Sequence, residues 1–371
     1  MENCKRKIQI TDWETEVDLN KPVSRYPGNP IITCVDVNCV WKDPRYQVIT
    51  VHNAGITFYN DEVIMLFRSH LRNGISVIGT ARSRNGINNW AIDSEPSIKP
   101  CNDKDVFAEG TNKNNLIENE AGGVEDPRIS RIRDTYFITY SAYHALKKDK
   151  VRVSLITTQD FKSFVRHGPL MDVDMRNVVI FPEKINDRYY ALFRPNDHTE
   201  DHTGGVFKEI QIGCNKDIFN NNWILTKEPI MRQAGGPSTF GSKIGPGATP
   251  IKTKYGWINI FHGVRGTMDG NPYTLGVALH DLKNPEKVQV SNIPILFPAK
   301  ADCRTKDEEY VHVPNVVFCC GAHRKDDGTI IIYYGGNDTV MNVGVTHEDV
   351  LVELCLKYPQ NSMNGIPAYP F

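Results

Sequence analysis

The stretch Asp61-Glu62-Val63-Ile64-Met65-Leu66-Phe67-Arg68 decides the fold, because its pattern recurs along the whole chain. A tight polar turn leads into a run of β-branched, aliphatic and aromatic residues, which is typical of a β-strand. Four further copies follow it: Asp134–Tyr140, Asp187–Arg194, Tyr255–His262 and Gly328–Gly335. The recurrence predicts one supersecondary unit that is used five times.

Each run has the same two neighbours. A short strand precedes it, so that strand, turn and run form a hairpin. These preceding strands are Ala54–Phe58, Pro127–Ser130, Val178–Phe181, Thr249–Lys252 and Asn315–Phe318. After a polar gap comes a third strand, at Ser76–Thr80, Val151–Leu155, Glu209–Gly213, Thr274–Ala278 and Met341–Val345.

The spacing of the runs indicates the architecture. They start at residues 61, 134, 187, 255 and 328, roughly 53 to 73 residues apart, which suits four-stranded propeller blades with inserted loops. One blade cannot bury both faces, so radial stacking must supply the core. We therefore predict an all-β protein, a five-bladed β-propeller. Residues 23–371 would form one domain, behind an N-terminal arm of residues 1–22.

Two points stay open at this level. A pair of β-sandwich domains could also use such strands, but the repeat continues through the chain without a linker between halves. The arm is polar and has no strong pattern, so it could dock on the domain or contact another copy of the chain.

Composition excludes several classes of function. The 371 residues carry a net charge of -1, which is not typical of nucleic-acid or membrane surfaces. No apolar run is long enough to span a bilayer, and no apolar segment follows the basic N-terminus as in a signal peptide. Nine scattered cysteines fit free thiols in a reducing cytoplasm. The eleven histidines lack metal-ligand spacing, so we expect no metal.

The segment Gly122-Gly123-Val124-Glu125-Asp126-Pro127-Arg128-Ile129 places two carboxylates side by side. The proline after Asp126 favours an extended conformation for this residue. Taken alone, the segment is a turn that enters a strand, with Arg128 as the ion-pair partner of Asp126.

Unusual residues lie at matched positions of the five units, which favours a shared site. Before the hairpins come Asn53, Asp126, Arg176-Asn177, Lys243 with Gly245-Pro246-Gly247, and Asn315; Arg68, Arg194 and His262 end their runs, and Asp338 follows the fifth. Equivalent positions in a propeller predict one ring of side chains around the central opening.

The predicted ring combines one prominent carboxylate, Asp126, with the cations Arg176, Arg194 and Lys243. Inverting glycoside hydrolysis uses two carboxylates, one of which activates water. Phosphate is already an anionic nucleophile, so phosphorolysis needs one acid and a cluster of Arg and Lys. Taken one at a time, each cation is better explained as a structural residue at a strand end or in a loop. His262 alone is better explained as a histidine of the core. Their matched placement favours a phosphorolytic site.

The chain resembles the mannoside phosphorylases of glycoside hydrolase family 130, five-bladed propellers that act on β-mannosides. The resemblance covers nearly the whole chain beyond the arm. It is carried by Val51–Ala54, Phe67-Arg68, Gly123–Arg128, Arg176–Pro182, Phe193–Pro195, Lys243–Gly247, Gly256-Trp257, His262–Val264, Val313–Phe318 and Tyr333–Asp338. One departure is Ala248-Thr249-Pro250, where many members have a proline pair.

The resemblance implies a role for each site residue. Asp126 would be the single general acid, acting through the 3-hydroxyl of the mannosyl unit. Arg176, Asn177, Arg194 and Lys243 would bind phosphate, and Asn53, Arg68, His262, Tyr273 and Asp338 would line the sugar site. No cofactor is implied, because inorganic phosphate is itself a substrate.

The resemblance also implies the reaction. A β-mannoside and phosphate would give α-mannose 1-phosphate and a shortened acceptor. Arg25–Ile31 and Asn53–Gly55 are more similar to members that cleave β-1,2 linkages. The alternatives are β-1,4-mannosyl-glucose or β-1,4-manno-oligosaccharide phosphorolysis, a β-mannoside hydrolase of the same fold, and a sugar-binding propeller without catalysis. A homo-oligomer is plausible.

Overall fold

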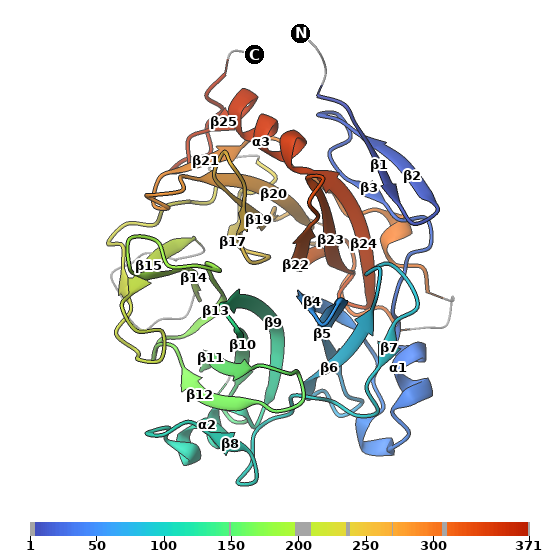
Figure 1. Ribbon diagram of the computed structural model, residues 1–371, viewed down its shortest axis with the longest axis vertical. Coiled ribbons are helices and arrows are strands. Elements are labelled where there is room, and N and C mark those ends of the chain that lie inside the picture. Colours follow the sequence, from blue (N-terminus) through green and yellow to red (C-terminus); the bar gives the residue numbers. More distant parts are fainter. Residues whose placement is uncertain are drawn as a thin grey trace.

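The computed structural model describes residues 4–147, 150–196, 209–234, 238–268, 270–305 and 310–369. This part of the chain is mostly β-strand with few helices. Figure 1 shows the sheets arranged around a common centre, with the helices towards the outside. The helices are α1 (Cys34–Val40), α2 (Lys113–Glu120) and α3 (Glu348–Lys357), with 3-10 turns at Pro44–Tyr46 and Lys300–Asp302.

All five predicted three-strand units are present as antiparallel sheets. The first two are β4 (His52–Tyr59), β5 (Glu62–His70), β6 (Ser76–Ser83), and β9 (Gly123–Ile132), β10 (Thr135–Tyr143), β11 (Val151–Thr158). The third is β13 (Met175–Ile180), β14 (Tyr189–Pro195), β15 (Gln211–Asn215). The fourth is β17 (Lys243–Pro246) and β18 (Ile251–Lys252), both paired with β19 (Trp257–Val264), then β20 (Tyr273–His280). The fifth is β22 (Val317–Arg324), β23 (Thr329–Gly336), β24 (Val340–His347).

Short outer strands extend the sheets. They are β7 (Ala91–Ile92) on β6, β12 (Val165–Pro169) on β11, β8 (Val106–Phe107) on β12, β16 (Ile224–Leu225) on β15, β21 (Val288–Ser291) on β20 and β25 (Pro359–Gln360) on β21. One parallel bridge between Ser76 and Gly123 joins the first two units into a single sheet of nine strands.

The two ends of the chain meet in the fifth sheet. Its outer strand is β3 (Ser24–Arg25), which pairs with Gly344 and Val345 of β24. Before β3, residues of the predicted arm form a hairpin of β1 (Arg6–Ile10) and β2 (Trp13–Val17), next to β24. Ile8, Ile10 and Val17 are buried there. Figure 1 shows both termini on the same side of the molecule.

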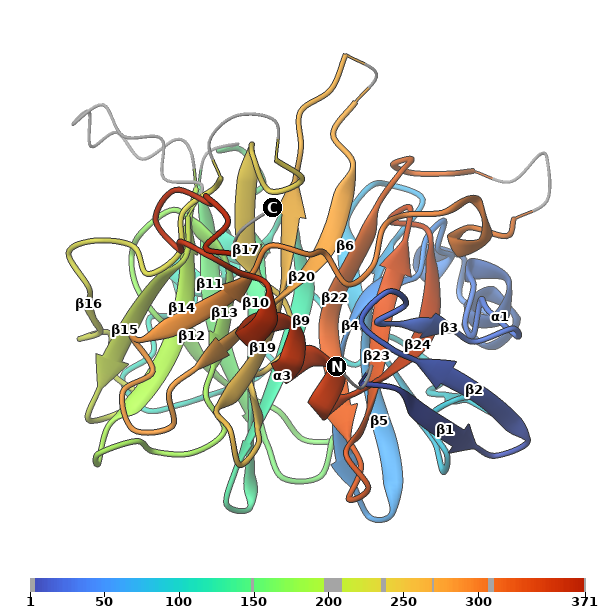
Figure 2. The same ribbon diagram turned by 90° about the horizontal axis from the view of Figure 1, so that it is seen from above.

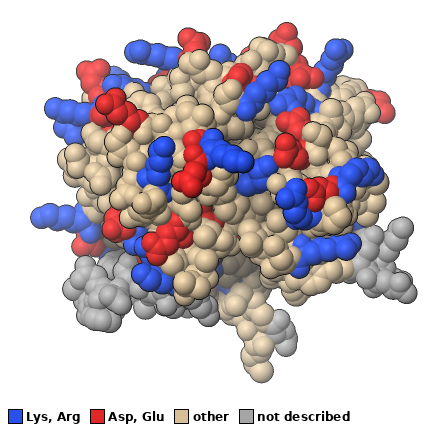
Figure 3. Space-filling model, turned by 90° about the horizontal axis from the view of Figure 1, so that it is seen from below, with Lys and Arg blue, Asp and Glu red and all other residues tan. Residues whose placement is uncertain are grey.

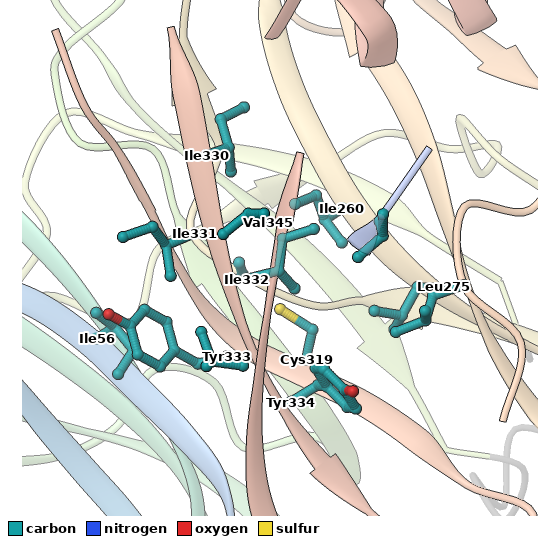
Figure 4. Close-up of a cluster of buried hydrophobic side chains, with 14 of the residues drawn as sticks. Ile56, Ile260, Leu275, Cys319, Ile330, Ile331, Ile332, Tyr333, Tyr334 and Val345 are labelled. Carbon is teal, nitrogen blue, oxygen red and sulfur yellow. The ribbon is translucent and has the colours of Figure 1, made fainter. Parts of the chain in front are cut away.

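The largest core cluster connects several sheets. Figure 4 shows Ile56 of β4, Ile260 of β19 and Leu275 of β20 around the side chains of β23. Every residue of β23 is buried, as expected for a strand with another sheet on each face. Burial on both faces explains why the five runs are continuously apolar.

The surface is mixed in charge. On the face shown in Figure 3, lysine and arginine side chains are interspersed with aspartate and glutamate. In Figure 2 the loop between β19 and β20 projects from one side of the sheets. No helix in the described ranges has the length and apolar character needed to cross a membrane.

Candidate active site

The inner strands of the units are interrupted at matched positions. Asn53, Asp126, Asn177 and Asn315 all have positive φ, between 49° and 60°. At the first three the strand register shifts, which marks a β-bulge. Asparagine and aspartate tolerate this left-handed conformation better than other residues with a side chain. The expectation that Asp126 is extended was therefore wrong, because the bulge overrides the influence of Pro127.

The bulges bring Asp126 to residues of the first unit. Asn53 Nδ2 and Arg68 Nη1 each donate a hydrogen bond to Asp126 Oδ1, both at 3.0 Å. The Asp126 side chain is almost completely buried. Both hydrogen bonds end on the same carboxylate oxygen, Oδ1.

Glu125, which sequence reasoning did not select, shares the same arginine. Arg68 Nη2 lies 2.8 Å from Glu125 Oε1, and Ser76 Oγ donates to the same oxygen at 2.7 Å. Burial raises the pKa of Glu125, but the charge of Arg68 and the hydrogen bonds of His70 and Ser76 together outweigh burial, and the pKa is lowered to about 2. Arg68 Nη2 also donates to His70 Nε2 at 2.7 Å. Arg68 is thus held between two carboxylates.

Arg128 does not pair with the carboxylate of Asp126. Its Nη1 donates to the main-chain oxygen of Asp126 at 2.8 Å, and its Nη2 donates to Asn177 Oδ1 at 2.9 Å. Its Nε donates to the carbonyl oxygen of Gly247 at 3.2 Å. Buried Arg128 therefore ties together the bulges of the second and third units and the glycine segment of the fourth.

The three predicted cations lie on the third and fourth units. Arg176 and Arg194 are directly paired across β13 and β14. Two like charges in this position destabilise a sheet unless something compensates for them. The Arg176 guanidinium lies 5.0 Å from the ring centre of Tyr143, and Lys243 Nζ lies 4.9 Å from that of Tyr273. Such a cluster is suited to an anion with several oxygens.

His262 and Tyr273 stand among these cations. Their rings stack at 5.9 Å, and a Cβ on Gly245 would collide with both His262 and Arg194, so only glycine fits there. Burial lowers the pKa of His262 far below its usual value, and the charges of Arg194 and Lys243 lower it further. His262 is therefore neutral at pH 7 and can donate or accept a hydrogen bond.

Tyr273 and Asp338 each interact electrostatically with arginine side chains of the site and with Asp126. Burial and, after it, the negative charge of Asp338 raise the pKa of Tyr273 to about 12, although Arg194 and Arg176 oppose the rise. The pKa of Asp338 is raised to about 6, first by burial, against the influence of Arg68, and also by the negative charge of Asp126. Asp338 and Tyr273 thus lie within electrostatic range of both halves of the site.

All ten predicted site residues belong to the described part of the chain, and the structure brings them together. What the sequence did not reveal is the layer behind them: Glu125, His70, Tyr143, Asp174 and Asn196. Asn196, for example, lies between Arg194 Nη1 at 3.4 Å and Asp174 Oδ1 at 3.2 Å. Among the described residues, no group of three or more His, Cys, Asp or Glu side chains could hold a metal ion.

Comparison with known proteins agrees with this geometry. The family model described as beta-1,4-mannooligosaccharide phosphorylase matches residues 22–357. The chain belongs to glycoside hydrolase family 130. It is 34% identical over 310 residues to a 1,2-beta-oligomannan phosphorylase of Thermoanaerobacter sp. (strain X514), covering 81% of this chain and 91% of that protein.

Two further similarities concern Listeria innocua. A beta-1,2-mannobiose phosphorylase of this organism is 30% identical over 383 residues, covering 86% of this chain and 94% of that protein. The solved structure of a beta-1,2-mannobiose phosphorylase from Listeria innocua with beta-1,2-mannobiose has a TM-score of 0.72 and 26% identity. That match covers 90% of this chain and 99% of the solved chain. The confirmed family membership makes the chain an enzyme of the phosphorylase type.

Proposed function

We propose that this enzyme is an inverting phosphorylase of β-mannosides, which forms α-D-mannose 1-phosphate and a shortened saccharide. The observation that carries the proposal is the cross-strand pair of Arg176 and Arg194 beside Lys243. Arginine and lysine side chains gathered in this way suit an anion with several oxygens. Inorganic phosphate supplies one, and the reaction needs no cofactor.

In the proposed reaction Asp126 is the general acid. Its proton passes to the glycosidic oxygen through the 3-hydroxyl of the mannosyl unit, and the bond from C1 to that oxygen breaks. A phosphate oxygen bonds to C1 from the opposite face, which inverts the configuration. Arg176, Asn177, Arg194 and Lys243 bind phosphate. Asn53, Arg68, His262, Tyr273 and Asp338 surround the sugar.

We also propose that the five sheets are the blades of one β-propeller, from residue 23 to the end, closed by the pairing of β3 with β24. This arrangement would direct the bulges of the first, second and third units to one central opening. The β-1,2 linkage is favoured, since the Thermoanaerobacter and Listeria relatives described above carry that linkage in their names. A β-1,4 linkage is the alternative.

The assay that tests the function compares product formation with and without phosphate. We expect β-1,2-mannobiose to yield mannose 1-phosphate only when phosphate is present. Asp126→Asn should reduce turnover about 10²–10⁴-fold, while Asp134→Asn, an exposed carboxyl at the β9–β10 turn, should not. Release of free mannose without phosphate would instead identify a hydrolase, and an unimpaired Asp126→Asn enzyme would refute the assignment of the acid.

A further inference from the structure

A second cavity lies outside the ring of site residues. Its volume is about 570 Å³, within the range of small-molecule sites. It is enclosed by α1, the segment before β4, the turn after β23 and residues near Tyr310. Val48, Ile49 and Val340 give it an apolar floor, and Arg72 and Tyr310 contribute to its polar rim.

The rim has the chemistry of a saccharide site. Tyr310 is half exposed, so one face of its ring is available to the apolar C–H face of a sugar. Arg72 is exposed at the same cavity and offers several N–H donors to hydroxyl groups. The described residues of the lining offer hydroxyl, amide and guanidinium groups as well as apolar surface.

The cavity shares a wall with the candidate active site. Tyr310 Oη lies 2.6 Å from His312 Nδ1, and the rings of His312 and His70 meet edge to face at 4.7 Å. His70 in turn contacts Arg68, the partner of Asp126. Thr339, which lines the cavity, follows Asp338 directly and accepts a hydrogen bond from the His312 main chain at 2.9 Å.

Inversion determines which side of the site the leaving saccharide occupies. The phosphate-binding cations come from β13, β14 and β17, whereas Arg68 and Asn53 come from β5 and β4, across the centre in Figure 1. Attacking phosphate and departing oxygen lie on opposite faces of the reacting carbon. A saccharide that leaves opposite phosphate departs on the side of β4, β5 and the turn after β23, and Val48, Ile49, Thr339 and Val340 of the cavity belong to this side.

We propose that this cavity binds the distal mannosyl units of a manno-oligosaccharide, beyond the linkage that is cleaved, with Tyr310 as the stacking residue. The proposal rests on the proposed function. It gives the enzyme a preference for chains longer than a disaccharide, because a disaccharide ends before it reaches the cavity.

The test is a chain-length series in the Tyr310→Ala variant. For mannosides of three or more units, of the linkage that the wild type cleaves, we expect kcat/KM to fall about 5- to 10-fold, the typical value of one aromatic contact. For mannobiose we expect a change below about twofold. Tyr255→Ala is the matched control, because Tyr255 has a similar exposure (48% against 50%) and does not line the cavity.

Three outcomes would overturn the proposal. Equal losses on mannobiose and longer chains would mean that Tyr310 acts on the reacting site through His312. Unchanged kinetics on every chain length would mean that the cavity binds no saccharide. A raised KM for phosphate in Arg72→Gln, with no dependence on chain length, would identify an anion site. The phosphate dependence of the wild-type enzyme is measured in a separate assay. That assay tests the proposed function independently of this proposal about the cavity.

Discussion

At the scale of single residues, the arrangement around Arg68 decides how Asp126, the proposed general acid, is held. One guanidinium is shared by Glu125 at 2.8 Å and Asp126 at 3.0 Å, and it also influences Asp338. A cation that served Asp126 alone would stabilise its carboxylate form and oppose proton donation. Because Glu125 also pairs with Arg68, this guanidinium does not serve Asp126 alone.

Replacing Glu125 by glutamine removes this sharing and keeps the shape of the side chain. We expect kcat to fall, because Arg68 loses one of the two carboxylates between which it is held and can shift relative to Asp126. Steady-state kinetics with saturating phosphate measure the change, with Ser76→Ala as the control that alters a hydrogen bond to Glu125 but no charge. An unchanged kcat in Glu125→Gln would contradict the prediction.

Other charged and titratable groups surround this pair and must remain intact in the comparison. These groups come from every neighbouring element. They are Arg68 and His70 from β5, Arg128 from β9, Tyr143 from β10, Tyr273 from β20, His312 before β22, and Asp338 after β23.

Asp338 should reduce the stability of the free enzyme at neutral pH. Its pKa is about 6 in the folded chain, against an ordinary value of 3.8, so the native state binds its proton more tightly than the unfolded state. Stability should therefore decrease as pH rises from about 4 to about 6 and stay lower above that. We expect Asp338→Asn to be about 1–3 kcal/mol more stable at pH 7.5 but not at pH 4.

Urea denaturation at both pH values measures this effect, and activity is recorded in parallel. The variant should lose turnover even as it gains stability, as is common when an active-site charge is removed. Asp134→Asn, an exposed carboxyl, should show neither change. Equal stability of Asp338→Asn and the wild type at pH 7.5 would show that the ionised carboxyl of Asp338 does not lower the free energy of unfolding.

The sequence was more informative about the site than about its supports. Asp126 and the cations were predictable because they recur at matched positions of a repeat. Glu125 was not selected, although it is adjacent to Asp126, because its role depends on Arg68 from another unit. Likewise, nothing local to Tyr143 indicates that Arg176 packs on its ring. Contacts between units are set by how the sheets pack, and one sequence does not show that.

At the scale of elements, the bulges on the inner strands matter most. A bulge turns a side chain out of the regular alternation of a strand. The polar residue at each bulge can therefore leave the apolar core and face the centre. The strand runs were predicted well, because continuous apolar patterns survive any packing. The left-handed residues were missed, because the extended preference before Pro127 was the only local signal at Asp126.

Asn315 allows a test of the left-handed backbone conformation alone, because its φ is 60° and its side chain is exposed. A β-branched residue is disfavoured there, so Asn315→Val should lower the free energy of unfolding by about 1–2 kcal/mol. Asn315→Gly, which tolerates positive φ, should stay within a few tenths of a kcal/mol of the wild type. Urea denaturation of both variants measures this difference. Equal free energies of unfolding for Asn315→Val and Asn315→Gly would mean that valine is not strained in this backbone conformation.

At the scale of the whole molecule, the last sheet is completed by the start of the chain. Only two residues of β3 pair with β24, so the closure needs support from side chains. Arg25 supplies it: its Nε lies 2.6 Å from Asp302 Oδ1, and its Nη2 lies 2.9 Å from Asp302 Oδ2. Tyr334 donates to the same carboxylate at 2.8 Å. The sequence did not predict this pair, because its members are far apart in the chain.

Breaking this ion pair should weaken the entire fold. In Arg25→Ala the fully buried carboxylate of Asp302 loses its cation, and an unpaired buried charge is strongly destabilising. Because Arg25 is itself about one-third exposed, we expect a loss of about 2–4 kcal/mol, below the value for a completely buried pair. Unfolding should remain one transition by both tryptophan fluorescence and circular dichroism, since every sheet depends on its neighbours. Lys21→Ala, just before β3, is the control and should change little. If Arg25→Ala instead produced a separate early transition, with activity intact, β3 would be an attachment to the sheets and the closure would not stabilise the whole molecule.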